Sequence, residues 1–215
     1  MRERPILFSA PMVRALLDGR KTQTRRVVTE LRGFGRTTEF GRSDTPGYDW
    51  HFRDKRACWN DVDDARLRQQ FCPYGVAGDR LWVRETYFGN HFQHPNEPEG
   101  ERELHYRADG LPDFEGEESL IRWRPSIHMP RWACRLVLEV TNVRVERLHA
   151  LSEDDALAEG CSGAMAPTWY ADRYGSLCGA QARYAFAALW ASLNGEASWH
   201  ANPCVWVIGF RRVTP

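Results

Sequence analysis

The strongest pattern in this chain of 215 residues is an alternation of apolar and polar side chains between Cys134 and Arg147. Apolar residues take every second position from 136 to 140, and again at 143 and 145, which predicts a long strand with one buried face. The alternation changes phase at Thr141 and Asn142, so we expect a β-bulge or a bend there. Residues 204–213 alternate in the same way. A chain with two such strands must build its core on a β-sheet.

Shorter segments complete the expected fold. We expect further strands at residues 6–8, 22–28, 80–86 and 104–107, and helices at residues 10–18, 61–71, 152–160 and 180–194. Ser9 and Ser152 are N-caps, and a glycine follows the end of several of these helices. Residues 29–70 and 89–120 are polar, and we interpret them as two loop-rich insertions with little regular structure before residue 61. The prediction is an α+β fold, a small mixed β-barrel with flanking helices, in a single domain that spans residues 1–215.

Charge and composition restrict the classes of protein to which the chain can belong. Its 29 basic and 29 acidic side chains cancel, which argues against a surface that coats nucleic acid. Hydrophobic residues make up 42% of the chain, so a disordered chain is excluded. The charge is nevertheless uneven, with nine basic against three acidic side chains in residues 1–36 and nine acidic against two basic in residues 97–118. These segments are either two solvated faces that compensate each other, or an electropositive site and a separate acidic loop.

The sequence contains neither a clear membrane-spanning segment nor a recognised metal-binding pattern. No apolar run approaches the roughly 18 residues of a transmembrane helix, and the N-terminus does not resemble a signal peptide, so we expect a cytoplasmic protein without a membrane partner. The six cysteines contain no CxxC pair, and we expect them to be reduced thiols. His91 and His94 form an HxxH pair with Cys58 and Cys72 upstream, but this polar segment lacks a recognised ligand pattern. We therefore expect neither a metal nor a cofactor.

The segment with the most chemical information is the octet Gly19–Arg26, which reads Gly-Arg-Lys-Thr-Gln-Thr-Arg-Arg and follows the first predicted helix. Lys21 is one of only two lysines in the whole chain, and the other basic residues are arginines. A guanidinium stays charged, whereas an ammonium that is desolvated or crowded by cations can lose its proton and act as a base. A neutral Lys21 near Thr24 could then activate the threonine hydroxyl as a nucleophile.

The neighbours of Lys21 bear on this hypothesis in two ways. The positive charges of Arg20, Arg25 and Arg26 would favour the loss of its proton. In a regular strand, however, Lys21 and Thr24 point to opposite faces, and they can act together only if the backbone turns between them. The alternative interpretation is an ordinary basic strand that binds an anion or faces the solvent.

Several segments together resemble an ASCH domain, which belongs to the PUA-like superfamily. They are the octet with the helix before it, the Gly-Asp-Arg-Leu-Trp-Val motif at residues 78–83, and the long strand at 134–147 that leads into Leu148–Glu153. In particular, the chain resembles phage and prophage proteins that begin with a Pro-Ile-Leu-Phe motif and end in a strand like Cys204–Ile208. The resemblance implies a β-barrel-like core of five or six strands, with helices that flank a cleft.

The resemblance also implies candidate catalytic residues. One small bacterial branch of ASCH proteins hydrolyses N4-acetylcytidine, with a lysine base, a threonine nucleophile and a glutamate proton donor. The octet assigns the first two roles to Lys21 and Thr24, and counting from the Leu-x-x-Leu-Ser-Glu opening at residue 148 assigns the third to Glu159. Glu85 is the reserve proton donor, because a carboxylate on an apolar strand face needs a partner or a purpose. Other ASCH proteins bind or cleave RNA, so the resemblance leaves both activities open.

The chain is longer than the small amidohydrolases, and its additional segments would reshape the substrate pocket. We expect contacts to a modified nucleoside or to RNA from aromatic rings that stack on bases, from arginines that hold phosphates, and from one histidine that acts as an acid or base. The expected substrate contacts are Arg20, Arg25, Arg26, Trp82, Arg84, Glu85, His128 and Arg131. The expected function is therefore either the removal of an acyl group from a modified nucleoside, or the binding or cleavage of RNA by a PUA-like module.

Overall fold

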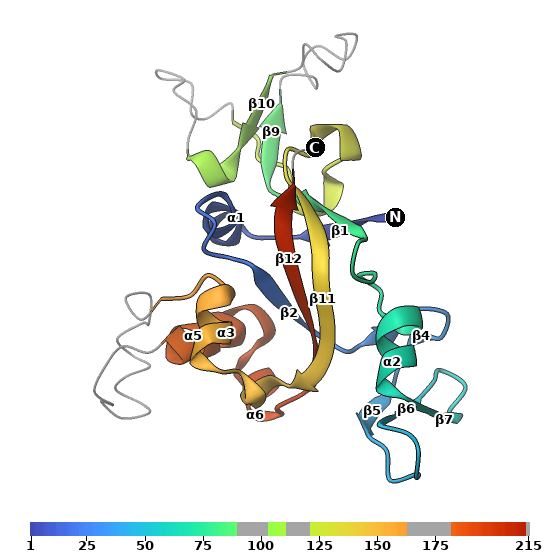
Figure 1. Ribbon diagram of the computed structural model, residues 1–215. Helices are drawn as coiled ribbons and strands as arrows, with labels where there is room; N and C mark the ends of the chain where they lie inside the picture. Colours follow the sequence, from blue (N-terminus) through green and yellow to red (C-terminus); the bar gives the residue numbers. More distant parts are fainter. Residues whose placement is uncertain (90–102, 111–120, 163–181, 214–215) are drawn as a thin grey trace.

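The computed structural model describes residues 1–89, 103–110, 121–162 and 182–213, and its centre is a five-stranded sheet (Figure 1). The strands are β1 (Glu3–Leu7), β2 (Gln23–Val27), β8 (Arg80–Arg84), β11 (Val137–Arg147) and β12 (Cys204–Val213). Their order is β1, β8, β11, β12, β2. β1 and β8 are parallel, and the other neighbours are antiparallel. The expected mixed α+β class is confirmed.

The central sheet is open in the part of the chain that the structure describes, so the closed form of the expected barrel is not observed there. Its edge strands, β1 and β2, still approach each other at one point, where Arg26 Nη2 donates a 2.6 Å hydrogen bond to Leu7 O. The helix α1 (Ala10–Leu17) connects the two edge strands and buries Val13 and Leu16 in the main core. This contact between the edges comes from a side chain and a carbonyl, and not from a ladder of backbone hydrogen bonds.

The two longest strands, β11 and β12, pair along their length, and the predicted bulge lies between Val140 and Asn142. The bulge keeps the apolar residues of β11 on one side of the sheet. Val140 before it and Val143 and Val145 after it all belong to the main core. The change of phase in the sequence therefore lets the long strand keep these three valines on the same face.

Three helices cover the other side of this pair of strands. They are α3 (Glu153–Ala158), α5 (Ala182–Asn194) and α6 (Glu196–His200), and they lie together in Figure 1. Val205 and Val207 of β12 pack against α3 and α5. Trp206 and Ile208 point to the opposite side, into the main core. Because both faces of β12 are covered, this strand is buried at every position from 204 to 208.

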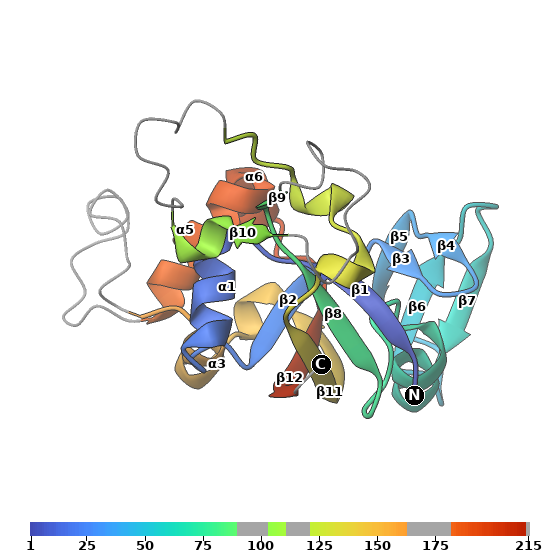
Figure 2. The same ribbon diagram turned by 90° about the horizontal axis from the view of Figure 1, so that it is seen from above.

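The expectation of a mostly irregular insertion before residue 61 is wrong. The segment forms short strands: β3 (Glu30–Leu31), β4 (Gly35–Arg36), β5 (Glu39–Arg42), β6 (Trp50–Arg53) and β7 (Trp59–Val62). β5, β6 and β7 make a three-stranded antiparallel sheet, which Figure 2 shows beside the central sheet. Trp50, Phe52 and Val62 from one face of it are buried in the main core. The apolar face of this small sheet is why these short strands are stable.

The other expected elements fall near their predicted positions where the structure describes them. The helix expected at 61–71 is α2 (Asp64–Arg66) followed by a π-helical turn at residues 67–71. β9 (Tyr87–Gly89) pairs with β10 (Leu104–Tyr106), so the strand expected near 104 is confirmed, while most of the 89–120 insertion lies outside the described residues. Single 3-10 turns occupy residues 107–109, 126–128, 131–133 and 148–150. No helix in the described ranges is both long enough and apolar enough to cross a membrane.

Candidate functional site

The segment around Lys21 is held between the end of α1 and the end of α3. After α1 the chain turns at Gly19, whose φ of +73° is favourable for glycine. The Lys21 N–H then donates to Ala15 O at 3.0 Å, and the Thr22 N–H donates to Ala158 O at 2.8 Å. Lys21 and Glu159 also form an isolated antiparallel bridge. Because β2 begins only at Gln23, Lys21 precedes the regular strand.

Lys21 and Glu159 form a buried ion pair. The Lys21 ammonium lies 2.8 Å from Glu159 Oε2 and also donates to the Glu159 backbone oxygen at 2.9 Å. The exposed fraction is 0% for the lysine side chain and 3% for the glutamate side chain. The Lys21 ammonium also lies 5.6 Å from the centre of the Phe8 ring. Because the pair is out of water, each of its charges is compensated by the other.

The C-terminus of α3 brings Glu159 to this position. Ser152 caps the helix in a capping box with Asp155, as the sequence predicts, and Glu159 is the residue at its C-terminal end. Gly160 follows with a φ of +85°. A Cβ on Gly160 would lie 2.9 Å from Ala15 Cβ and 3.2 Å from Lys21 Cβ. A glycine is needed here because the backbone combines a left-handed conformation with close approach to the lysine.

Arg25 connects Glu159 to a larger network of charges. Its side chain is fully buried, and its guanidinium lies 3.3 Å from Glu159 Oε1, 2.5 Å from Glu146 Oε1 and 3.1 Å from Asp155 Oδ2. Arg144 bonds to Glu146 at 3.0 Å and to Asp155 at 2.8 Å. The cluster contains three cations, which are Lys21, Arg25 and Arg144, and three carboxylates, which are Glu146, Asp155 and Glu159. It is therefore neutral when all of these groups are charged.

The pKa of Asp155 shows the effect of this network. Burial alone would raise the pKa of this carboxyl group. A hydrogen bond from Gln23 and the charges of Arg25 and Arg144 outweigh burial, so the pKa lies well below its ordinary value. The backbone N–H of Ser152 contributes in the same direction. Asp155 therefore remains ionised at neutral pH and holds α3 against β2 and β11.

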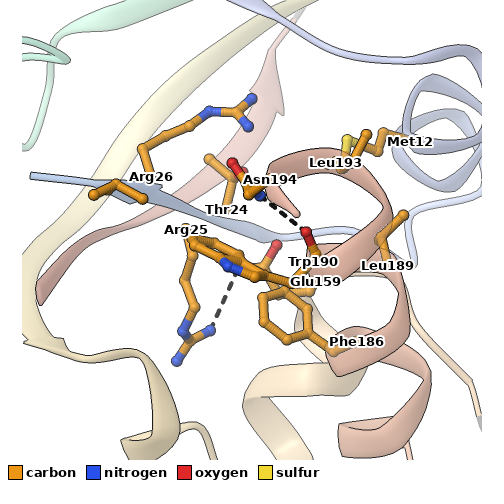
Figure 3. Close-up of a pocket in the computed structure, with 11 residues that line it drawn as sticks. Met12, Thr24, Arg25, Arg26, Glu159, Phe186, Leu189, Trp190, Leu193 and Asn194 are labelled. Carbon is orange, nitrogen blue, oxygen red and sulfur yellow. Dashed lines mark hydrogen bonds and ion pairs between the residues drawn. The ribbon is translucent and has the colours of Figure 1, made fainter. Parts of the chain in front are cut away.

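A small cavity of about 60 Å³ lies between β2 and α5, next to this ion pair (Figure 3). Thr24 and Glu159 both line it. Its other lining residues are Met12, Arg25, Arg26, Val27, Phe186, Leu189, Trp190, Leu193 and Asn194. Figure 3 shows the side chains of α5 as one wall and those of β2 as another. Thr24 is 1% exposed, and it lines the cavity together with Glu159. The cavity therefore combines a mainly apolar α5 wall with a hydroxyl and a carboxylate.

The relation between Lys21 and Thr24 is indirect. No hydrogen bond joins them in the described structure, and Lys21 is not among the residues that line the cavity. Both residues are close to Glu159, which pairs with Lys21 and lines the cavity together with Thr24. Glu159 is therefore the residue that connects the buried Lys21 with the cavity that Thr24 lines.

Each arginine of the octet has polar partners of its own, and Arg25 shares the Glu159 carboxylate with Lys21. Arg20 is exposed and pairs with Asp18 at 2.8 Å, and Arg25 is surrounded by carboxylates. Arg26 donates to Leu7 O and lies over the Phe8 ring. The ion-pair partner of Lys21 is a carboxylate because the turn before β2 directs the lysine toward the end of α3 and not along its own strand.

Six of the eight expected substrate contacts do not line the cavity, among them Arg20 and Glu85. In β8, Leu81 and Val83 point into the main core, so Trp82 and Arg84 belong to the opposite face of the sheet. Arg84 lies over the Trp82 ring and donates to Ile127 O. Arg131 forms an ion pair with Glu3 at 3.0 Å, and His128 is exposed. None of Trp82, Arg84, His128 and Arg131 lines the cavity.

Glu85 has a partner of its own. It is 1% exposed and accepts two hydrogen bonds from Arg135, at 2.9 and 3.0 Å. Burial still outweighs Arg135 and raises the pKa of Glu85. Arg135 also pairs with Asp109 and lies 3.9 Å from the centre of the Tyr106 ring, while burial raises the pKa of Tyr106 to about 12. Glu85 does not line the cavity. The cluster of Glu85, Arg135, Asp109 and Tyr106 connects the end of β8 with β10 and the segment that follows it.

Sequence reasoning missed the charged residues that surround Arg25 and one wall of the cavity. Arg144 and Glu146 alternate with valines in β11, so their shared face was visible, but their partner on α3 was not. Asp155 was visible only as a residue of a helix N-terminus. The α5 wall of the cavity was expected as an apolar helix face, and no sequence signal linked it to Thr24.

The expected metal candidates cannot be placed as a group, because His91 and His94 lie outside the described residues. Within the described ranges there is no group of three or more His, Cys, Asp or Glu residues with metal-binding geometry. Cys58, Cys72, Cys134, Cys161 and Cys204 are free thiols, and Cys178 is not described. Comparison of the chain with models of protein families, with curated proteins and with solved structures found no match.

Proposed function

We propose that the protein is an amide hydrolase that removes a small acyl group from a modified nucleoside of the N4-acetylcytidine type. The observation that carries this proposal is the position of Glu159. Its carboxylate pairs with the buried Lys21 ammonium at 2.8 Å and lines the same cavity as Thr24. A base, a hydroxyl nucleophile and a proton donor are the groups that acyl transfer from an amine requires.

The ion pair supplies both proton-transfer groups in one contact. When its proton moves from Lys21 Nζ to Glu159 Oε2, the lysine becomes a neutral base and the glutamate becomes an acid. Thr24 Oγ1 then attacks the acyl carbon, and its proton passes to Lys21, directly or through one water. Glu159 protonates the nitrogen that leaves, so cytidine is released and the acyl group stays on Thr24. Water hydrolyses this ester and regenerates the threonine.

The size and lining of the cavity support a small acyl group as the part of the substrate that enters it. A volume of about 60 Å³ is far below that of sites that enclose whole drug-sized ligands. Its apolar wall includes Phe186, Trp190 and Leu193 from α5. Leu193 is 54% exposed, so it lies at the solvent side of this wall. The nucleobase would therefore remain outside, with only the acyl group buried beside Thr24.

The open sheet is compatible with the proposed ASCH-type fold. Its two edge strands are connected through α1 and bridged by the hydrogen bond from Arg26 to Leu7 O, a contact that supports a barrel-like arrangement. The candidate site lies on the β2 side of this contact, between a strand edge and two helices. We propose this fold as the scaffold of the site.

RNA binding is less well supported by the contacts of the basic residues. Arg20 pairs with Asp18, Arg131 pairs with Glu3, and Arg25 is fully buried. Such guanidiniums would have to leave protein carboxylates before they could hold phosphates. Trp82 is half-buried and does not line the cavity.

The test is the release of acetate and cytidine from N4-acetylcytidine by the purified protein. We expect Lys21→Gln, Thr24→Val and Glu159→Gln each to lower kcat by about 100-fold or more, the usual contribution of such groups. Lys55→Gln is the matched control, because Lys55 is the other lysine of the chain and is exposed. A wild-type protein that is inactive on a panel of N4-acylated cytidines would contradict the proposal. Salt-sensitive binding of single-stranded RNA by that inactive protein would favour the alternative.

A further inference from the structure

Arg25 has three ion pairs, more than any other residue in the described part of the chain. Its side chain has no exposed surface, although it belongs to the edge strand β2. The guanidinium lies 5.9 Å from the centre of the Phe186 ring, on the side of the cavity formed by α5. A charge buried this completely must be compensated, and the surrounding carboxylates provide that compensation.

The two ends of the guanidinium have different partners. Nη1 lies 3.3 Å from Glu159 Oε1, and Nη2 contacts Glu146 and Asp155. The second oxygen of Glu159, Oε2, is the one that pairs with Lys21. Each carboxylate oxygen of Glu159 therefore contacts a different cation, and the rotation of the carboxyl group is restricted from both sides.

We propose that Arg25 is a positioning residue. Its guanidinium, which is held by Glu146 and Asp155, binds the Glu159 carboxylate and keeps it in contact with Lys21. This role rests on the function proposed above. The guanidinium always keeps its protons, so it can donate a hydrogen bond to Oε1 whether the shared proton is on Lys21 or on Glu159. Its planar fork also contacts separate carboxylates at the same time, which the single ammonium of a lysine cannot do with the same geometry.

The chain provides a matched control in Arg144. Arg144 pairs with the same two carboxylates, Glu146 and Asp155, at 3.0 and 2.8 Å, but it has no ion pair with Glu159. Arg144→Gln and Arg25→Gln both remove a guanidinium from the cluster. Only Arg25→Gln removes the anchor of the proposed proton donor.

The first experiment measures hydrolysis of N4-acetylcytidine by these variants. We expect Arg25→Gln to lower kcat by about 10- to 100-fold with KM within about twofold of wild type, since small displacements of reacting groups have effects of this size. Arg25→Lys, which keeps the charge and the fold more closely, should recover part of that loss.

The kcat of the control variant Arg144→Gln should stay within about threefold of the wild-type value at a temperature where the variant is folded. In a Glu159→Gln background, Arg25→Gln should add little further loss, because the two residues act as one unit.

The second experiment does not depend on activity and uses the scarcity of lysine. Native protein is treated with an amine-reactive ester, and the modification of Lys21 is compared with that of the exposed Lys55 in the same sample by peptide mass spectrometry. We expect Lys21 to be protected in the wild type and in Arg144→Gln, and to react several-fold faster in Arg25→Gln. This result would support the positioning role even if the wild type hydrolyses no acylated cytidine, in which case only the proposed activity fails.

Two outcomes would overturn the inference. One is a Lys21 that is protected equally in Arg25→Gln and in the wild type. The other is an Arg144→Gln variant with the same loss of protection or of kcat as Arg25→Gln, since Arg25 would then act only through general stability. If Arg25→Gln does not fold, the same comparisons are made between Arg25→Lys and Arg144→Lys.

Discussion

At the scale of single residues, the candidate site depends on a glycine as much as on its charged groups. Gly160 adopts a φ of +85°, and its Cα faces the β-carbons of Ala15 and Lys21. The bridge between Lys21 and Glu159 needs this close approach of the end of α3 to the segment before β2. A residue without functional groups therefore sets the distance between the proposed base and acid.

Gly160→Ala should destabilise the protein by about 1–3 kcal/mol or more, because it adds crowding at 2.9 Å to an unfavourable backbone conformation. Gly195→Ala is the control: its φ is +84°, but a Cβ there meets nothing within 4 Å. The free energies of unfolding of both variants are measured with urea. An equal loss in the two variants would show that the contact with Ala15 and Lys21 has no energetic effect. We also expect Lys21 to lose its protection from amine-reactive esters in Gly160→Ala only.

At the scale of elements, α3 is held in place mainly by charged side chains. It is a short helix with one buried residue of its own, Ala156, so its apolar contacts alone are limited. Asp155 Oδ1 accepts a 2.9 Å hydrogen bond from the Gln23 side-chain amide, and the Asp155 carboxylate forms ion pairs with Arg25 and Arg144. These contacts join the helix to β2 and β11, and they place Glu159 at the end of the same helix.

Because the fold lowers the pKa of Asp155, this residue should make the protein sensitive to acid. Its contribution is complete above the ordinary aspartate pKa of about 4 and is lost as the pH falls toward the lower value in the folded protein. Asp155→Asn should therefore lower stability at pH 6 and flatten its dependence on pH below about 4. Asp154→Asn, at an exposed position of the same helix, should leave that dependence unchanged. Urea unfolding between pH 2.5 and pH 6 measures both, and an unchanged slope in Asp155→Asn would refute the assignment.

At the scale of the whole molecule, the two larger sheets share one core. Trp50, Phe52 and Val62 of the small sheet belong to the same buried cluster as Trp206 and Ile208 of the central sheet. Neither sheet buries its apolar face without the other. We therefore expect both sheets to unfold together, even though residues 39–62 look like an insertion in the sequence.

Phe52→Ala should lower the free energy of unfolding by about 3–5 kcal/mol, the usual loss for a large buried aromatic residue. Far-UV circular dichroism and tryptophan fluorescence should report a single transition at the same lower urea concentration. Trp59→Ala is the control, because Trp59 lies in the same sheet with 54% of its surface exposed, and its effect should be within about 0.5 kcal/mol. Two separate transitions in the wild type would contradict a shared core.

The regular elements were largely predictable from local patterns. The alternation in β11 and β12, the bulge at 140–142 and the capping box of α3 all follow from side chains that are neighbours in the sequence. The strands of residues 39–62 were missed because each has only four residues, which is too short for alternation to stand out from a polar background. The role of their buried aromatic residues is evident only in the tertiary structure, where these residues pack against the central sheet.

The octet nominated Lys21 and Thr24, and the family resemblance added Glu159, but neither described how these residues meet. The sequence by itself determined which residue types are present, where the longer strands and the helices form, and that Lys21 is one of only two lysines among many arginines. Only the tertiary structure decided that Lys21 faces a carboxylate, that Arg25 is buried in contact with three carboxylates, and that Trp82 and Arg84 do not line the cavity. The physical reason is that local periodicity selects the face of an element, whereas the partner of a buried charge comes from a distant segment, and its identity depends on how the elements pack.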